Sequence, residues 1–157
     1  MADPRQPLYL DDLAVGQRFE TASLKVSADD IRAFAAQFDP QPFHLDDAAA
    51  RQTLFGGLSA SGWHTAALTM RLQVESGLPF ANGWLGAGGS VEWPNATRPG
   101  DVLHVVGEII DIHPSKSRAD RGIVTVRSET RNQDDKVVQV TTAKLIVFRR
   151  AAPAGSR

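Results

Sequence analysis

The second half of the chain contains four strand-like segments joined by short turns, and one strongly apolar helical segment precedes them. The predicted strands are residues 85–93, 102–113, 122–132 and 136–149. Turn signals such as Pro99-Gly100-Asp101 separate them, and strands do not alternate with helices. A chain with this order is expected to fold as an α+β domain, in which a mostly antiparallel sheet wraps around the apolar helix.

That helical segment runs from about residue 61 to Gly77 and is apolar on two sides. Leu68 and Leu72 lie on one side, and the other carries a stripe at helical spacing made of Trp63, Ala66, Ala67, Met70 and Val74. Apolar surface on two sides predicts a buried helix. Gly77 and the following Leu78-Pro79 are expected to end it.

The first half contains a predicted strand at residues 17–26 and then a helix. Ser27 resembles an N-cap residue, and apolar side chains repeat at helical spacing after it. The helix is expected to stop at Asp39, because Pro40 disfavours helical geometry in the residue before it. A short helical turn is predicted at residues 46–51.

Composition sets the class of protein. The 157 residues are 42% hydrophobic, which fits one domain over 1–157, with 1–7 and 151–157 as flexible tails. The chain has no cysteine, so thiol catalysis and disulfides are excluded. A net charge of -1 gives no basic footprint for nucleic acid, and no segment resembles a membrane span or signal peptide. We therefore expect a cytoplasmic protein without nucleic-acid or membrane partners.

An aspartate and a histidine stand in a proline-rich loop. Pro40 and Pro42 bracket Gln41 in what we predict is a rigid, extended loop that delivers His44 near Asp39. A histidine that titrates near neutrality beside a carboxylate can exchange protons with water, and a stiff loop keeps both groups in place. The alternative is that Asp39 caps its helix and His44 is a half-buried loop residue.

The turn at residues 56–62, GGLSASG, is the second candidate. Gly62, at a helix start and without a side chain, would let a carbonyl oxygen reach free backbone N–H groups where the helix dipole favours negative charge. Ser59 or Ser61 is the predicted N-cap. The alternative is a simple helix-entry turn. A nucleophile elbow is excluded, because Ser61 stands where G-x-S-x-G requires glycine.

Three other motifs give weaker indications of a functional site. His64 is interpreted as a hydrogen-bonded structural histidine. A metal site built from His44, Asp46 and Asp47 lacks a third firm ligand, so no metal and no cofactor is expected. The run GAGGS at residues 86–90 fails as a nucleotide loop and instead indicates a bulge or a close approach to the buried helix.

Residues 39–44, 55–58 and 61–65, which read DPQPFH, FGGL and SGWHT, resemble the MaoC-like dehydratases, relatives of the (R)-specific enoyl-CoA hydratases. The likeness extends over nearly all of residues 9–149. It implies a hot-dog fold, an acyl-CoA or acyl-carrier thioester as substrate, a role in fatty acid metabolism, and a homodimer or higher homo-oligomer with acyl chains near the subunit interface.

The resemblance also implies residue roles. The family's catalytic pair falls on Asp39 and His44, which would deprotonate a water that adds to C3 of a trans-2-enoyl thioester and return a proton at C2. The N–H of Gly62 would polarise the thioester carbonyl. The predicted substrate-binding residues are Phe38, Gln41, Phe43, Ser61 and Trp63.

This sequence departs from the family motif at three of these positions. Phe38 replaces a glycine, Gln41 an asparagine, and Phe43 an aliphatic residue. The two phenylalanines would narrow the acyl tunnel, and Gln41 keeps an amide with a longer reach. The altered motif leaves two other functions open: a non-catalytic acyl-thioester or lipid-binding protein and, as a weaker option, an acyl-CoA thioesterase.

Overall fold

The computed structural model describes residues 5–151. In that range the strands are β1 (Arg18–Glu20), β2 (Leu24–Lys25), β3 (Gly86–Glu92), β4 (Val102–Pro114), β5 (Arg121–Arg131) and β6 (Val137–Phe148). The helices are α1 (Ala28–Phe38), α2 (Pro42–Leu45), α3 (Asp47–Arg51) and α4 (Gly62–Ser76), after a short 3-10 turn at Leu10–Asp12. The four strands predicted in the second half are confirmed, and the strand predicted at 17–26 is divided into β1 and β2.

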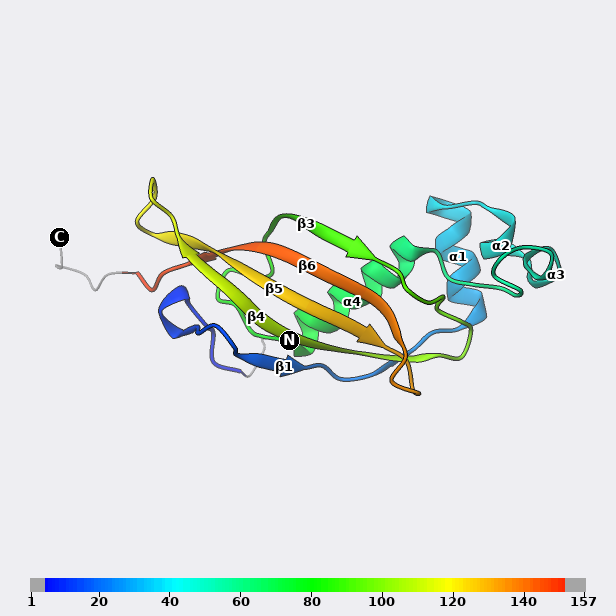
Figure 1. Cartoon of the computed structure of the whole chain (residues 1–157), viewed down its shortest axis with the longest axis horizontal. Coiled ribbons are helices and arrows are strands. Elements are labelled where there is room, and N and C mark those ends of the chain that lie inside the picture. Colours follow the sequence, from blue (N-terminus) through cyan, green and yellow to red (C-terminus); the bar gives the residue numbers. More distant parts are fainter. Residues whose placement is uncertain (1–4, 152–157) are drawn as a thin grey trace.

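The strands form one antiparallel sheet in the order β1-β4-β5-β6-β3, and β2 also pairs with β4. Helix α4 lies lengthwise along one face of this sheet, whereas α1, α2 and α3 gather at one end (Figure 1). Strand β6 ends at the opposite end of the molecule (Figure 1). The predicted α+β plan of an antiparallel sheet around one long helix is therefore confirmed.

Local sequence signals set the boundaries of α1 and α2. The Ser27 side chain accepts a hydrogen bond from the Asp30 N–H, as an N-cap should, and α1 ends at Phe38 before Asp39-Pro40. The loop predicted to be extended up to His44 is shorter than expected. Pro42 takes the first position of α2, because its fixed φ suits a helix start, so His44 is held on a helical turn.

Apolar side chains from the sheet and helices form two clusters. The first is Leu10, Leu78, Phe80, Ile109, Val124, Val126, Leu145 and Val147, and the second is Val26, Ile31, Leu58, Ala60, Leu72, Leu103, Val105 and Val138. In β5, Val124 and Val126 are buried while Arg127 is exposed. The core therefore fixes which face of β5 meets α4.

Beside these clusters, α4 meets β5 through polar side chains. The hydroxyls of Thr69 and Thr130 lie 2.6 Å apart, and the Gln73 amide donates to the Ser128 hydroxyl at 2.8 Å. All four residues are buried. Buried polar groups cost free energy unless they are hydrogen-bonded, so these pairs define how α4 is rotated on the sheet.

This rotation contradicts one prediction. The apolar stripe on α4 faces away from the sheet, and its members Trp63, Met70 and Val74 are 60%, 43% and 52% exposed. The prediction that this stripe is buried is wrong for a single copy of the chain. Helical periodicity identified the stripe, but the hydroxyl and amide pairs with β5 decide which face turns inward.

The glycines of β3 and the chain ends complete the fold. The register of β3 on β6 shifts between Gly86 and Gly88, so the predicted bulge is confirmed. The close approach at Gly89 is to the backbone of β6 at Thr142, not to the helix. Of the predicted tails, 1–7 and 151–157, residues 1–4 and 152–157 lie outside the described residues. Arg5, in the first of these tails, donates hydrogen bonds to the carbonyls of Gly77 and Glu75.

Candidate functional site

Asp39 and His44 meet at the end of the molecule where α1 and α2 join. Asp39 is the C-cap residue of α1, and His44 lies on α2. The His44 Nε2 is 3.3 Å from the Asp39 Oδ2, and the two side chains are 5% and 17% exposed. The two side chains predicted to act together are thus adjacent and largely shielded from water. Asp39 also ends its helix, as the alternative reading proposed, but His44 is buried and does not stand half-exposed in a loop.

A carbonyl oxygen determines the tautomer of His44. The Nδ1 lies 2.6 Å from the Ser59 carbonyl oxygen, which can only accept a hydrogen bond, so Nδ1 carries a hydrogen. In the neutral imidazole the Nε2 is then unprotonated and directed at the Asp39 carboxylate. Uptake of a proton at Nε2 would turn this contact into an ion pair. The arrangement is suited to accepting one proton.

The Asp39 carboxylate accepts two further hydrogen bonds. The Gln41 amide donates to Oδ1 at 2.5 Å, and the Ser61 hydroxyl donates to Oδ2 at 2.7 Å. Burial acts to raise the pKa of Asp39, but these two bonds and the nearby His44 together outweigh it and hold the pKa below its ordinary value. Asp39 is therefore ionised at neutral pH. Gln41, despite its longer side chain, reaches this carboxylate.

Ser61 and Gly62 bring the start of α4 to the same place. The Ser61 side chain accepts from the Trp63 N–H and so caps α4, as one of the two predicted N-caps. Gly62 is the first helical residue, and among residues 5–151 its N–H has no hydrogen-bond acceptor. Because Ser61 also donates to Asp39, this free N–H lies one residue from a bond to the carboxylate. A helix N-terminus favours negative charge on a bound group.

Trp93 closes over Gly62, a contact for which the sequence carried no signal. A Cβ placed on Gly62 would lie 2.6 Å from a ring atom of Trp93, so glycine is required by this close approach. The Trp93 indole N–H donates to Gln139 at 2.9 Å, and the Trp63 ring packs edge-on at 5.2 Å. Gln139 is buried and anchors the indole. Trp93 thereby fixes the entry of α4.

The predicted substrate-binding aromatic residues differ in their surroundings. Phe43 packs edge-on against His44 at 4.5 Å and lies 5.0 Å from Phe55, so it covers the imidazole. Phe38 is 63% exposed and Trp63 is 60% exposed. Ser61 is fully buried, and its hydroxyl is used by Asp39. Their roles in substrate binding remain predictions.

His64 departs from its predicted role. Its ring stacks on Phe34 at 4.7 Å, and its buried Nδ1 has no hydrogen-bond partner among the described residues. The prediction of a hydrogen-bonded histidine is thus wrong. Burial lowers the pKa of His64, and Asp30 opposes this only in part, so the neutral ring is favoured.

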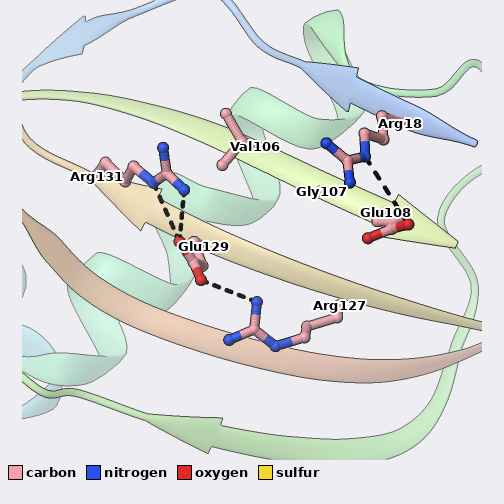
Figure 2. Close-up of a pocket in the computed structure, with 7 residues that line it drawn as sticks. All are labelled: Arg18, Val106, Gly107, Glu108, Arg127, Glu129 and Arg131. Atoms are coloured by element: carbon pink, nitrogen blue, oxygen red, sulfur yellow. Dashed lines mark hydrogen bonds and ion pairs between the residues drawn. The ribbon is translucent and has the colours of Figure 1, made fainter. Parts of the chain in front are cut away.

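A separate cleft of about 210 Å³ lies on the face of the sheet formed by β1, β4 and β5. Figure 2 shows Arg18, Arg127 and Arg131 around this cleft, which contains no member of the Asp39–His44 pair. Glu129 binds Arg131 at 2.7 Å and Arg127 at 2.9 Å, and Glu108 lies 3.8 Å from Arg18. These carboxylates balance much of the positive charge. Arg18 and Glu108 face each other across β1 and β4, whereas Glu129 binds its neighbours on the same strand β5.

Residues 5–151 contain no group of three His, Asp or Glu side chains placed to hold a metal ion. In the same range, no helix has the length and apolar character needed to cross a membrane.

Comparisons with known proteins show the family of this chain. Residues 12–133 match the family model described as a MaoC like domain. The chain belongs to the MaoC-like family. A MaoC-like dehydratase from Rhodospirillum rubrum has a similar structure, with a TM-score of 0.91 and 63% identity over 92% of this chain and 99% of that one. The resemblance recognised in the sequence and its hot-dog fold are confirmed.

Two relatives are similar in sequence. The uncharacterized protein YdeM of Bacillus subtilis is 38% identical over 90% of this chain and 98% of its own length. A 3-hydroxybutyryl-CoA dehydratase of Methylorubrum extorquens is 31% identical over 71% of this chain and 70% of its own length. At the level of the MaoC-like family, the chemistry is that of a hydratase or dehydratase.

Proposed function

We propose that this MaoC-like protein catalyses the reversible addition of water to a trans-2-enoyl thioester, carried by CoA or by an acyl-carrier protein. The observation that carries the proposal is the contact of Asp39 with His44 and with Ser61, the residue that precedes Gly62 and its free N–H. Proton transfer and oxyanion stabilisation are the two functions that this reaction needs. The dehydratase named among its relatives acts on a 3-hydroxyacyl-CoA, the product of such a hydration.

In the proposed reaction a water binds beside the Asp39–His44 pair, within hydrogen-bonding reach of the carboxylate and of the Nε2. As the water oxygen bonds to C3, its proton passes to Nε2, and the electrons of the C2–C3 double bond move onto the thioester oxygen. The enolate-like oxygen accepts the N–H of Gly62 at the positive end of α4. The imidazolium then returns the proton to C2. The thioester bond stays intact, and one water is consumed for each hydroxyacyl product.

Asp39 has two roles in this scheme. Its ionised carboxylate orients the water, and it stabilises the imidazolium that forms when His44 takes up the proton. The hydrogen bonds from Gln41 and Ser61 keep Asp39 ionised and fixed. The tautomer set by Ser59 leaves Nε2 free to act as the base.

The test measures the consumption of a panel of enoyl-CoA substrates of increasing chain length. The loss of enoyl-thioester absorbance reports the reaction. We expect Asp39→Asn and His44→Ala to lower kcat by about 10²–10⁴-fold. His113→Ala is the matched control, because His113 is an exposed histidine of β4 outside the site. Equal activity in the wild type and both site variants would sink the proposal.

A non-catalytic acyl-thioester-binding protein is the second candidate. The observation that favours it is the aromatic crowding of the site, where Phe43 packs against His44 and Phe55. This candidate predicts that calorimetry detects acyl-CoA binding while no chain length is turned over. Release of free CoA in the same assay would instead indicate a thioesterase.

We also propose that the protein acts as a homodimer, with a second copy covering the exposed stripe of α4. Trp63, Met70 and Val74 of this stripe are large apolar side chains facing solvent in the single copy. Strand β3 is one end of the sheet order, and within residues 5–151 no strand pairs with its outer edge. Burial of apolar surface and of strand edges favours association.

A further inference from the structure

Arg98 lies in the connection between β3 and β4 and binds the turn that precedes α4. Its Nη1 donates to the Gly57 carbonyl at 2.9 Å and to the Ser59 hydroxyl at 2.8 Å, and its Nη2 donates to the Phe55 carbonyl. One guanidinium therefore binds three acceptors within five residues. Its planar fork of donors suits several fixed acceptors at once.

The charge of Arg98 is not used in an ion pair. Among residues 5–151, no carboxylate is bonded to its guanidinium, and the bonds it makes are to neutral oxygens of the turn. A half-buried arginine pays side-chain entropy for such an arrangement. The turn it holds includes Gly56, which has a φ of +66° and stands next to Gly57. Consecutive glycines give a mobile backbone unless other groups fix it.

The segment that carries Arg98 is itself anchored to the sheet. The Asp101 carboxylate accepts the Arg98 backbone N–H at 2.8 Å and the Gln133 amide at 3.1 Å. The neighbouring Thr97 carbonyl accepts the Ala60 N–H at 2.9 Å. Arg98 thus ties the turn before α4 to the end of the sheet.

The turn matters because Ser59 orients His44. The Ser59 carbonyl accepts from the His44 Nδ1 at 2.6 Å, and the Ser59 N–H donates to the Phe43 carbonyl at 3.1 Å. A shift of this carbonyl would rotate the imidazole or release its tautomer. The order of contacts is therefore Arg98 to the turn, the turn to His44, and His44 to Asp39.

We infer that Arg98 is a positioning residue of the active site, which fixes the Ser59 carbonyl and through it the tautomer and orientation of His44. The inference rests on the hydratase function proposed above and identifies the residue that positions His44, the base of that reaction. Arg98 does not contact the substrate in this scheme. Its contribution is to keep the hydrogen of the neutral imidazole on Nδ1, so that Nε2 is the nitrogen directed at Asp39.

Arg98→Ala tests the inference by kinetics and by chemical rescue. We expect kcat to fall on the order of 10²-fold with little change in KM, because the catalytic base is misplaced while binding surfaces remain. Added guanidinium ion should restore part of kcat by refilling the vacated space. Arg98→Lys should have a kcat below that of the wild type, because one ammonium group cannot reach all three acceptors. Arg98→Ala activity equal to wild type, or a loss that appears in KM alone, would overturn the inference.

Arg149→Ala is the matched control. Arg149 binds a loop carbonyl, that of Ala119, and the carboxylate of Asp11. It directly follows β6, which ends at the opposite end of the molecule from α1–α3 (Figure 1). It should leave kcat unchanged and show no response to guanidinium. A guanidinium response of equal size in this variant would mean that the rescue reflects general stabilisation and would overturn the inference.

A second readout does not depend on activity. Long-range ¹H–¹⁵N spectra report which nitrogen of His44 carries the hydrogen. We expect the Nδ1–H tautomer in the wild type and a mixture of tautomers in Arg98→Ala, recovered with guanidinium. If the wild type turns over no enoyl thioester, the proposed function fails, and the spectra alone decide the role of Arg98. An unchanged His44 tautomer in a folded Arg98→Ala protein would overturn the inference.

Discussion

Gly62→Ala is the substitution whose effect the structure defines most closely. The new Cβ would stand 2.6, 2.7 and 2.8 Å from three ring atoms of Trp93, where ordinary contact begins at 3.4 Å. The indole must therefore move away by about 0.8 Å to relieve the closest of these contacts. It is held by a hydrogen bond to Gln139 and by packing against Trp63.

The cost of this movement can be bounded. If the indole stays, overpacking costs about 1–3 kcal/mol. If it swings outward, the buried amide of Gln139 loses its partner, which also costs about 1–3 kcal/mol. Replacing glycine by alanine also stabilises the fold by about 0.4–1 kcal/mol, because the unfolded chain has less conformational entropy. We expect a net loss of about 1–2 kcal/mol in the free energy of unfolding and a fall in kcat of up to about 10²-fold.

Urea unfolding and enoyl-CoA turnover measure these two effects. Gly57→Ala is the control in the same turn, because its Cβ would meet neighbours at an ordinary 3.6 Å. In a Trp93→Ala background the space opens, so Gly62→Ala should lose its cost and stabilise the protein by about 0.4–1 kcal/mol. An equal cost of Gly62→Ala with and without Trp93 would refute the reasoning that the indole makes glycine necessary.

Three further predictions concern His64, Ser61 and Met70. Burial lowers the pKa of His64 below its ordinary 6.5, so the unfolded chain binds this proton first. The stability that neutral His64 contributes is therefore fully present above pH 6.5 and is lost as the pH falls through the pKa of the folded state. In urea unfolding at several pH values, the free energy of unfolding of His64→Phe should fall less steeply with decreasing pH than that of the wild type. Ser61→Ala removes the cap of α4, so the free energy of unfolding should fall by about 1 kcal/mol. It also removes a hydrogen bond that lowers the pKa of Asp39, so the acid limb of the pH profile of kcat/KM should move to higher pH. An acid limb at the same pH as in the wild type would contradict this role of Ser61. Met70→Asp, in the exposed stripe, should shift the protein to monomers in light scattering, whereas Lys144→Asp, at the exposed residue of β6, should not.

Local patterns were sufficient to predict much of the fold. Ser27 and Pro40 mark the two ends of α1, and both signals act within a few residues of the backbone they control. The strands of the second half follow from their composition and their turns. The resemblance to MaoC-like proteins added the topology, which none of these local signals contains.

The rotation of α4 was not predictable from periodicity. Its apolar stripe contains Trp63 and Met70, yet Thr69 and Gln73 face the sheet because they find partners on β5. A pattern of apolar residues cannot distinguish a face that meets the sheet from one that meets another subunit. His64 was misread for a related reason, since the sequence does not show that Phe34 stacks on its ring.

The residues missed at the candidate site are distant in sequence from the residues they hold. Arg98 stands 39 positions from Ser59, and Trp93 is 46 positions from Gln139. Neither belongs to a motif with a fixed spacing. Their importance comes from tertiary contacts, which composition and local spacing do not encode.

Ser61 connects the two parts of the site that the sequence presented separately. Its hydroxyl donates to Asp39 and accepts the Trp63 N–H, so one oxygen fixes the carboxylate relative to the start of α4. The distance between the proton acceptor and the N–H of Gly62 is therefore not set independently by the loop and the helix. Because an enoyl thioester places C3 and the carbonyl oxygen at a fixed separation, a hydration catalyst must hold its base and its oxyanion donor at a matching one. A single buried hydroxyl shared by both groups is a physical means of maintaining that match.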